Sequence, residues 1–448
     1  MPVSPARGAA FDILLRVERE SSYASELLHS AAYENLSTPD HGLATELVMG
    51  VLRWRSLLDD QISQASSQPL KKLDLEVRIA LRLALYQFEY LTRIPHRAAL
   101  HESVELVKRA RKRSAAPFVN AVLRKLSKDP LCSPVIPVVK DFSSESLSNA
   151  YAHPRWLIDR WLNLYGSEAT HKICQHNQSI PETTLRLRTP NAENELASEG
   201  ISLAPGSLLA QARRVLAGDV TKTQAFHDAR IVIQDEASQL IAALIGPGHN
   251  RILDCCAAPG GKTLAIADQN PAASITAVEI HPHRARIMQS RFPNDTRIET
   301  VVADACNLPP TQPFDRILAD VPCSGTGTLA RHPEIKWRLT PADLAELQQR
   351  QLTILRSALQ HLRPGGQLIY STCSLENEEN EDVIDQVLTR PNSFRLIDCR
   401  TELDRLKSSG TLTWSDVDSF TRGPYLRTIP GVHPCDGFFA AILERNVE

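Results

Sequence analysis

The alternation of short apolar runs with amphipathic segments, which begins at Ile231, restricts the C-terminal half of this chain to one fold class. The apolar runs are RILDCCA, SITAVEI, IETVVAD, FDRILAD, QLIYSTC and FFAAIL, and helical patterns such as LAELQQRQLTILRSALQHL separate them. Strands that alternate with helices in this way are typical of βαβ units on a mostly parallel sheet. We therefore expect a doubly wound α/β domain over residues 231–448.

The N-terminal part of the chain has a helical pattern instead. Ile79, Leu83, Tyr86 and Tyr90 recur at a spacing that places them on one face of a helix. This pattern predicts an all-α domain over residues 1–130.

Between these two parts the composition changes twice. Pro130, Pro134 and Pro137 interrupt any helix in a Pro- and Ser-rich stretch, which predicts a linker over residues 131–150. The next segment starts with the helical pattern HPRWLIDRW and continues with short β-like runs such as TTLRLRT. It predicts a small α/β domain over residues 151–230.

Composition excludes several classes of protein. The first 20 residues lack a signal-peptide pattern and no stretch reaches the ~20 apolar residues of a membrane span, which predicts a cytoplasmic protein. The nine cysteines lack the spacing of a disulfide framework or a metal site, so no metal is expected. A net charge of −2 gives no general argument for nucleic acid, and the basic run 108–113 suits a solvated helix face as well as an RNA phosphate contact.

A turn rich in small residues follows the first strand of the α/β domain, in LDCCAAPGGKT. Gly260 and Gly261 let backbone N–H groups approach a ligand, and a helix N-terminus behind them favours an anionic group. Gly261-Lys262-Thr263 resembles the end of a P-loop, but Cys256 stands where that loop needs its first glycine and Pro259 lacks an N–H donor. The turn therefore favours another ligand with an anionic tail over a nucleotide triphosphate.

Two acidic residues close the next two strands. Glu279 ends SITAVEI at the distance from the glycine turn where doubly wound folds bind the hydroxyls of a ribose. Asp304 ends VVAD, where it is suited either to accept from an adenine amino group or to cap the following turn. The spacing alone does not decide between these two roles for Asp304.

Two cysteines follow later strands, in Asp320-Val321-Pro322-Cys323-Ser324 and in Ser371-Thr372-Cys373-Ser374. The carboxyl ends of parallel strands meet at one edge of the sheet, so both thiols are expected in one pocket. A metal pair lacks further ligands, and two structural thiols are the alternative to a reactive pair.

The runs LDCCAAPGGKT, DVPCSGTG, RHPEIKW and YSTCS together resemble the catalytic domain of the RNA cytosine-C5 methyltransferases, the NOL1/NOP2/Sun family. The helical N-terminal domain, HPRWLIDRW, QDEASQL and HPCDGFFAAIL resemble the bacterial 16S ribosomal RNA branch of that family, the Sun/Fmu type. The resemblance covers nearly the whole chain. It implies a Rossmann-like S-adenosylmethionine-dependent domain preceded by a NusB-like RNA-binding domain and a small intermediate RNA-binding domain.

The resemblance also implies roles for individual residues. Cys373 is the expected nucleophile, Cys323 assists loss of the C5 proton or product release, and Asp320 positions the base beside the methyl group. The expected S-adenosylmethionine-binding residues are Cys256, Ala257, Ala258, Pro259, Gly260, Gly261, Lys262, Glu279, Asp304 and Asp320. The family usually has Asp where this chain has Glu279, and the longer side chain still allows a bidentate contact.

The chemistry explains why two cysteines are useful. Carbon 5 of cytosine is a poor nucleophile, so a thiolate must add to carbon 6 first, which requires surroundings that favour the ionised form of Cys373. DNA cytosine-C5 methyltransferases use only the Pro-Cys cysteine, so the second thiol favours RNA. The expected partner is 16S rRNA, naked or partly assembled, because the target base must be unstacked. A tRNA substrate and a non-catalytic RNA-binding assembly factor are the alternatives.

The run RHPEIKW follows the Pro-Cys motif closely. This position suggests that Arg331, His332 and Lys336 line the RNA side of the site.

Overall fold

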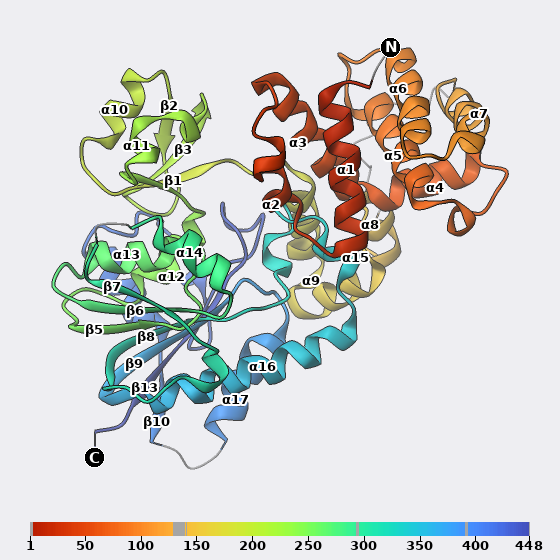
Figure 1. The fold of residues 1–448 in the computed structure, drawn as a ribbon. Helices are drawn as coiled ribbons and strands as arrows, with labels where there is room; N and C mark the ends of the chain where they lie inside the picture. Colours follow the sequence, from red (N-terminus) through yellow and green to blue (C-terminus); the bar gives the residue numbers. More distant parts are fainter. Residues whose placement is uncertain (1–2, 129–138, 140, 293–294, 390–392, 448) are drawn as a thin grey trace. The chain divides into compact units, whose positions relative to one another are not determined.

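The computed structural model describes residues 3–128, 139, 141–292, 295–389 and 393–447 (Figure 1). The chain divides into two compact units. Unit 1 contains Met1–Ile180 together with Leu329–Arg338, and unit 2 contains Pro181–Thr328 together with Leu339–Glu448.

Unit 1 is built from helices packed around α5, which runs from Leu75 to Tyr90. The predicted apolar face is buried at Ile79, Leu83 and Tyr86, but Leu81 and Leu85 on the other side are buried too. This happens because helices from both sides of α5 contribute to the same apolar core. The other helices of the unit are α1 (Pro5–Glu20), α2 (Ala24–Leu28), α3 (Thr38–Arg53), α4 (Arg55–Ala65), α6 (His96–Arg109), α7 (Ala116–Leu126), α8 (Ser144–Tyr151), α9 (Arg155–Gln178) and α15 (Ile335–Arg338).

Helices α8 and α9 lie in the region where the sequence predicts a linker and the start of an intermediate domain. Residues 131–138 and 140 of that linker lie outside the described residues, whereas Ser144–Tyr151 is helical. Helix α9 is interrupted at Gly166, whose φ of 77° is left-handed, so the pattern HPRWLIDRW forms the first of its two helical segments. No helix among the described residues is long and apolar enough to cross a membrane.

Glu89, near the end of α5, is a buried carboxyl whose Oε1 has no hydrogen-bond partner. Burial raises its pKa to about 7 from an ordinary value of 4.5, and a hydrogen bond from Gln61 offsets part of that rise. A folded-state pKa above the unfolded value means that folding favours the protonated form. Stability is therefore greatest below the unfolded pKa and falls as the pH rises through about 7.

We expect Glu89→Gln to be more stable than the wild-type chain at pH 8, by about 1–2 kcal/mol after allowance for solvent screening. The difference should shrink toward zero below the ordinary pKa of 4.5, where the Glu89 carboxyl is protonated in the folded and the unfolded chain alike. Urea unfolding across this pH range measures it, with exposed Glu34→Gln as the control. A pH-independent difference would contradict the assignment.

Unit 2 contains a small antiparallel sheet with strand order β2-β3-β1-β4. Its core is built around Leu185, Leu196 and Ile231, which come from a strand, a helix and a strand. The elements of this subdomain are β1 (Thr184–Leu187), α10 (Ala192–Ser198), β2 (Ser202–Pro205), β3 (Ala212–Ala217), α11 (Gln224–His227) and β4 (Ile231–Ile233).

The larger sheet of unit 2 has the order β11-β12-β13-β9-β8-β5-β6-β7, and β10 pairs with β13 outside this path. Strands β9, β8, β5, β6 and β7 are parallel, whereas β13 is antiparallel to β9. Its strands are β5 (Arg251–Asp254), β6 (Ser274–Glu279), β7 (Ile298–Val302), β8 (Phe314–Asp320), β9 (Leu362–Thr372), β10 (Phe394–Ile397), β11 (Thr421–Arg422), β12 (Tyr425–Arg427) and β13 (Phe439–Arg445). The strand order reverses direction between β5 and β8, which is where such sheets bind ligands.

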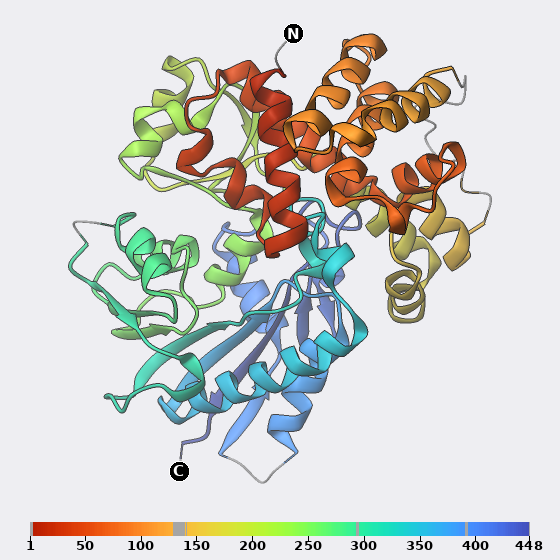
Figure 2. The ribbon, with the colours of Figure 1, turned by 45° about the vertical axis from the view of Figure 1, so that its right-hand side comes forward.

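Helices cover both faces of this sheet, as the near-continuous apolar strands predict. Ile252 and Ile369 face a core shared with α12, α13 and α18, whereas Leu253 and Leu368 face a core shared with α16 and α17. Figure 2 shows α16 lying along the strands on its face. The helices are α12 (Glu236–Ala243), α13 (Gly261–Gln269), α14 (Pro282–Gln289), α16 (Pro341–Gln360), α17 (Glu381–Leu388) and α18 (Cys399–Ser408). The predicted α/β fold of this region is therefore confirmed.

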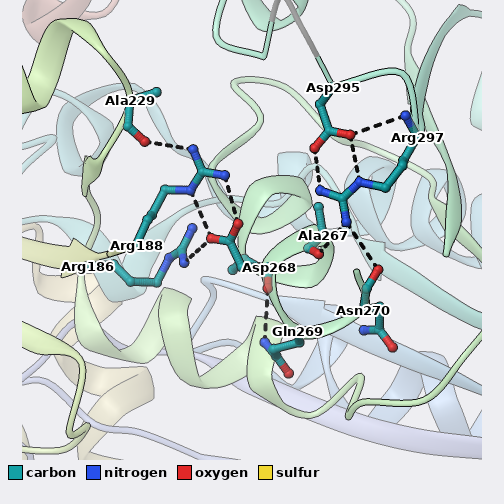
Figure 3. Close-up of polar contacts among 10 residues, drawn as sticks. Arg186, Arg188, Ala229, Ala267, Asp268, Gln269, Asn270, Asp295 and Arg297 are labelled. Carbon is teal, nitrogen blue, oxygen red and sulfur yellow. Dashed lines mark hydrogen bonds and ion pairs between the residues drawn. The ribbon is translucent and has the colours of Figure 1, made fainter. Parts of the chain in front are cut away.

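An arginine cluster joins the small sheet to α13 (Figure 3). Arg186 lies in β1, and Arg188 follows the end of that strand. Both arginines pair with Asp268 in the last turn of α13, at 2.6 and 2.7 Å. Arg297 binds Asp295 and also donates to the carbonyl oxygen of Ala267, near the end of the same helix. Cations at a helix C-terminus are favourable, so the cluster holds the subdomain against α13.

Candidate active site

The turn after β5 opens α13 in the way that the sequence predicts. Gly260 has a left-handed φ of 96°, and a Cβ there would lie 3.0 Å from Met288 Cγ, so the position favours glycine. Asp254, at the end of β5, is buried and accepts a hydrogen bond from Thr263 Oγ1 at 2.7 Å. Burial raises the pKa of Asp254 to about 6. The sequence analysis did not single out Asp254, because a strand-terminal aspartate has no distinctive signature.

Cys256 lies in this turn with a thiol that stays protonated. Burial raises the pKa of Cys256 well above its ordinary value, and the negative charge of Asp254 adds to the effect. A thiolate is therefore disfavoured here, in contrast with a reactive cysteine. This environment suits a residue that shapes a turn.

Glu279 and Asp304 lie at the carboxyl ends of the next strands. Glu279 is 5% exposed, and its Oε1 accepts from the backbone N–H of His281 at 2.8 Å. Asp304 accepts from the backbone N–H of Cys306 at 2.9 Å, so the capping role that the sequence left open is present. A ligand-binding role for either residue stays a prediction.

Lys262 and Asp320 form an ion pair beside the turn. Lys262 Nζ lies 2.7 Å from Asp320 Oδ2, and the Ser371 hydroxyl donates to Asp320 Oδ1 at 2.8 Å. Burial alone would lower the pKa of Lys262, but the adjacent Asp320 carboxylate outweighs it, and the pKa is raised. The ammonium also lies 5.0 Å from the ring centre of Phe438. This pair joins the start of α13 to the end of β8 at the reversal point of the sheet.

The two predicted cysteines meet at the same edge. Cys323 Sγ and Cys373 Sγ are 3.3 Å apart, although 50 residues separate them in the chain. The hydrogen bond with Cys373 raises the pKa of Cys323 well above its ordinary value, and burial adds to this rise. A thiolate at Cys323 is therefore disfavoured.

Close backbone packing holds the cysteine loops together. The backbone N–H of Gly327 donates to the carbonyl oxygen of Cys373 at 2.9 Å, and that of Gly437 donates to Gly327 at 2.8 Å. A Cβ on Gly327 would lie 2.2 Å from the carbonyl oxygen of Gly437, so no larger residue fits. The sequence analysis did not single out Gly437, since its partner is distant in the chain.

Glu379 is a second residue that the sequence analysis missed. It is fully buried and accepts hydrogen bonds from Ser324 and Ser374, the residues that follow the two cysteines. Sequence patterns do not distinguish this carboxylate from neighbouring Glu378, which is only partly buried.

The RHPEIKW segment belongs to unit 1 and does not leave Lys336 free for RNA. Lys336 is 1% exposed, and its Nζ donates to the carbonyl oxygen of Arg53 at 2.9 Å. Trp337 Nε1 donates to Leu52 at 2.6 Å, at the end of α3. The prediction that Lys336 lines the RNA side is wrong, because its side-chain nitrogen is buried and donates to the last turn of α3 instead. Burial lowers the pKa of Lys336 well below its ordinary value.

We expect Lys336→Ala to lower the free energy of unfolding by about 2–4 kcal/mol, because it leaves a cavity and an unpaired carbonyl oxygen. Lys336→Met keeps the volume and should retain most of the stability. Denaturant unfolding of both variants, combined with RNA affinity, tests this. If Lys336→Ala were as stable as the wild-type chain but bound RNA more weakly, the prediction that Lys336 contacts RNA would be supported again.

Carboxylates lie beside the basic run 108–113 and pair with some of its side chains. Lys108 pairs with Glu105 at 2.7 Å, and Lys112 pairs with Asp74 at 3.0 Å. Both of the interpretations from the sequence stay open, since surface pairs of this kind are weak and exchange readily.

Comparison with known proteins identifies the family to which this chain belongs. Residues 242–444 match the family described as 16S rRNA methyltransferase RsmB/F. Over 459 residues, and 100% of both chains, the sequence is 34% identical to a probable ribosomal RNA small subunit methyltransferase B from Bacillus subtilis. The chain belongs to the RsmB/F methyltransferase family. It is also 31% identical to the ribosomal RNA small subunit methyltransferase B of Shewanella oneidensis, with 98% and 97% of the two chains covered.

The remaining segments of this RsmB/F family member match families too. Residues 4–128 match the NusB family, and residues 153–216 match the ferredoxin-like domain of the RsmF/B-like methyltransferases. The crystal structure of PH0851 shares the fold over 99% of this chain and 100% of its own, with a TM-score of 0.80 at 22% identity. The structure of NSun6 from Pyrococcus horikoshii with SFG covers 66% of this chain and 99% of its own, with a TM-score of 0.55 at 20% identity. The predicted family and fold class are confirmed, and the chain is a methyltransferase.

Proposed function

We propose that this chain transfers a methyl group from S-adenosylmethionine to carbon 5 of a cytosine in 16S rRNA, with Cys373 as the nucleophile. The observation that carries the proposal is the pair of thiols 3.3 Å apart, because the proposed chemistry needs one thiol to add to carbon 6 and a second to assist product release. The names of the relatives from Bacillus subtilis and Shewanella oneidensis support the small-subunit rRNA as substrate.

The residues present fit S-adenosylmethionine. The turn 256–262 brings small side chains and the N-terminus of α13 together, which suits the carboxylate of the methionine part. Glu279 closes β6, where a carboxylate binds ribose hydroxyls, and Asp304 lies at the end of β7 for the adenine. When bound, the cofactor supplies an electrophilic methyl group.

In this proposal the side chains at the carboxyl edge of the sheet carry out the protein's part of the reaction. The Cys373 thiolate adds to carbon 6, which breaks the C5–C6 double bond and moves its electron pair to carbon 5, where the methyl group is received. Asp320, held by Lys262, is positioned to bind the N3/N4 edge of the base. The sulfur of Cys323, in its thiolate form, then accepts the C5 proton. The electron pair of the C5–H bond restores the C5–C6 double bond, and the bond from carbon 6 to Cys373 breaks to release the Cys373 thiolate.

The proposed domain boundaries remain 1–130, 131–150, 151–230 and 231–448. The NusB-like domain and the ferredoxin-like domain contribute RNA binding in this proposal. The extra domains distinguish the chain from a bare methyltransferase domain, and they favour a large structured RNA as partner.

Incubation with tritiated S-adenosylmethionine tests the substrate. Naked 16S rRNA, mature 30S subunits and bulk tRNA are compared, and labelled RNA is digested to nucleosides. Label in naked 16S rRNA, recovered as 5-methylcytidine, is the expected result. Label in tRNA alone would overturn the rRNA substrate but leave the chemistry intact, and no label at all would favour an RNA-binding assembly factor.

A further inference from the structure

The carboxylate of Glu379 lies between the two cysteine loops, fully buried in unit 2. It stands at the end of the short 3-10 turn Asn377–Glu379, just before α17. A buried carboxylate requires compensation by hydrogen bonds or a cation, so its partners indicate what it holds.

The partners of Glu379 come from both loops. Its Oε1 accepts from the backbone N–H of Ser324 at 2.8 Å and from Gln351 Nε2 at 2.9 Å. Its Oε2 accepts from the hydroxyls of Ser324 and Ser374. Because Ser324 follows Cys323 and Ser374 follows Cys373, this one carboxylate fixes the spacing of the two thiols.

The charge of Glu379 has no cationic counterpart among the described residues, which include no Lys or Arg paired with it. Its field acts on the adjacent sulfur, since the negative charge contributes to the raised pKa of Cys323 after the Cys373 hydrogen bond and burial. On the other side of the pair, the Lys262 ammonium interacts with Cys373. The carboxylate of Glu379 therefore acts on Cys323, and the ammonium of Lys262 interacts with Cys373.

We propose that Glu379 is a positioning residue, which sets the distance between the two cysteine loops and makes Cys323 the less reactive of the two thiols. A negative charge beside Cys323 disfavours its thiolate, so we expect Cys373 to be the more reactive sulfur before substrate arrives. The different roles of the two cysteines then come from the charges around them. This inference rests on the proposed function for its role in catalysis, but the difference in thiol reactivity requires neither RNA nor cofactor.

Alkylation of the free protein tests the difference in thiol reactivity directly. The rates at which iodoacetamide modifies Cys323 and Cys373 are measured by peptide mass spectrometry from about pH 6 to about pH 9, where thiolate content controls the rate. In the wild-type chain we expect Cys373 to react about tenfold faster than Cys323 or more. Glu379→Gln keeps the shape but removes the charge, and the ratio should fall to within about threefold.

Glu236→Gln is the matched control. Glu236 is also a buried carboxylate, 2% exposed, but it accepts from the backbone N–H groups of Ser207, Leu208 and Leu209. Its loss should lower the melting temperature without changing the alkylation ratio. A Glu379→Gln variant that lost stability but kept the wild-type ratio would behave like this control, and the proposal would be overturned.

A second variant covers the case in which Glu379→Gln does not fold. Gln351→Lys places an ammonium where the amide now donates to Glu379, which neutralises the charge and leaves both serine contacts in place. It should reduce the alkylation ratio in the same way, and an unchanged ratio overturns the proposal.

Kinetics then test the link to catalysis. We expect Glu379→Gln to lower kcat by about tenfold to a hundredfold, with KM for RNA within about twofold, because RNA contacts are untouched. Failure of the wild-type chain to methylate cytosine would overturn the proposed function, but the alkylation ratio would still decide the role of Glu379.

Discussion

Methyl transfer by Cys373→Ala is expected to fall at least about a thousandfold, because the proposed nucleophile that adds to carbon 6 and activates carbon 5 is lost. In the Cys323→Ala variant, Cys373 should still add to the base, but the base should not be released. A covalent protein–RNA adduct is therefore expected to accumulate. Tritium incorporation measures the first effect, and denaturing gel electrophoresis of labelled RNA with protein measures the second. The partial exposure of both thiols makes neither substitution a large core cavity.

Cys399→Ala is the matched control for these variants. Cys399 is a fully buried thiol between α18 and the sheet, so its removal should lower stability and leave turnover per folded molecule unchanged. If Cys323→Ala abolished transfer and Cys373→Ala trapped the adduct, the roles of the two cysteines would be reversed.

Separating the ion pair of Lys262 and Asp320 should have the next largest effect. We expect Lys262→Met and Asp320→Asn each to lower kcat by about a hundredfold, since both place charge at the base and at Cys373. The double variant should be little worse than the more damaged single variant, because the two groups act as one unit. Single-turnover methyl transfer to saturating RNA measures all three.

Asp315→Asn is the control for this pair. Asp315 lies at the opposite end of β8 from Asp320 and pairs with Arg363 at 2.6 Å. Its loss removes an ion pair from the same strand and should affect stability rather than kcat. Additive losses in the Lys262 and Asp320 double variant would mean that the two residues act independently.

The site residues that follow the ends of strands lie where the sequence predicts them. The apolar runs ending in Asp320 and Thr372 could be assigned to parallel strands, and the rule that such strands share a carboxyl edge was enough to bring Cys323 and Cys373 together. Glu379 could not be found in this way, because burial and hydrogen bonding, and not residue type, make it different from Glu378.

Lys336 shows the opposite limit. It lies close in sequence to the Pro-Cys motif, yet its segment packs in unit 1 against helix ends that precede it by about 280 positions. Its position near the Pro-Cys motif in the sequence suggested that it could reach RNA, because lysines are usually exposed and are rarely buried without a carboxylate partner.

By itself, the sequence determined the fold class, the order of the domains and the strand ends that carry reactive residues. These features depend on the period of apolar residues and on local turn chemistry, which neighbouring residues encode. Only the tertiary structure decided which carboxylates are buried, which lysine caps a helix and which carboxylate joins the two cysteine loops. Those properties depend on desolvation and on charges brought within a few ångströms by residues far apart in the chain, which no local pattern records.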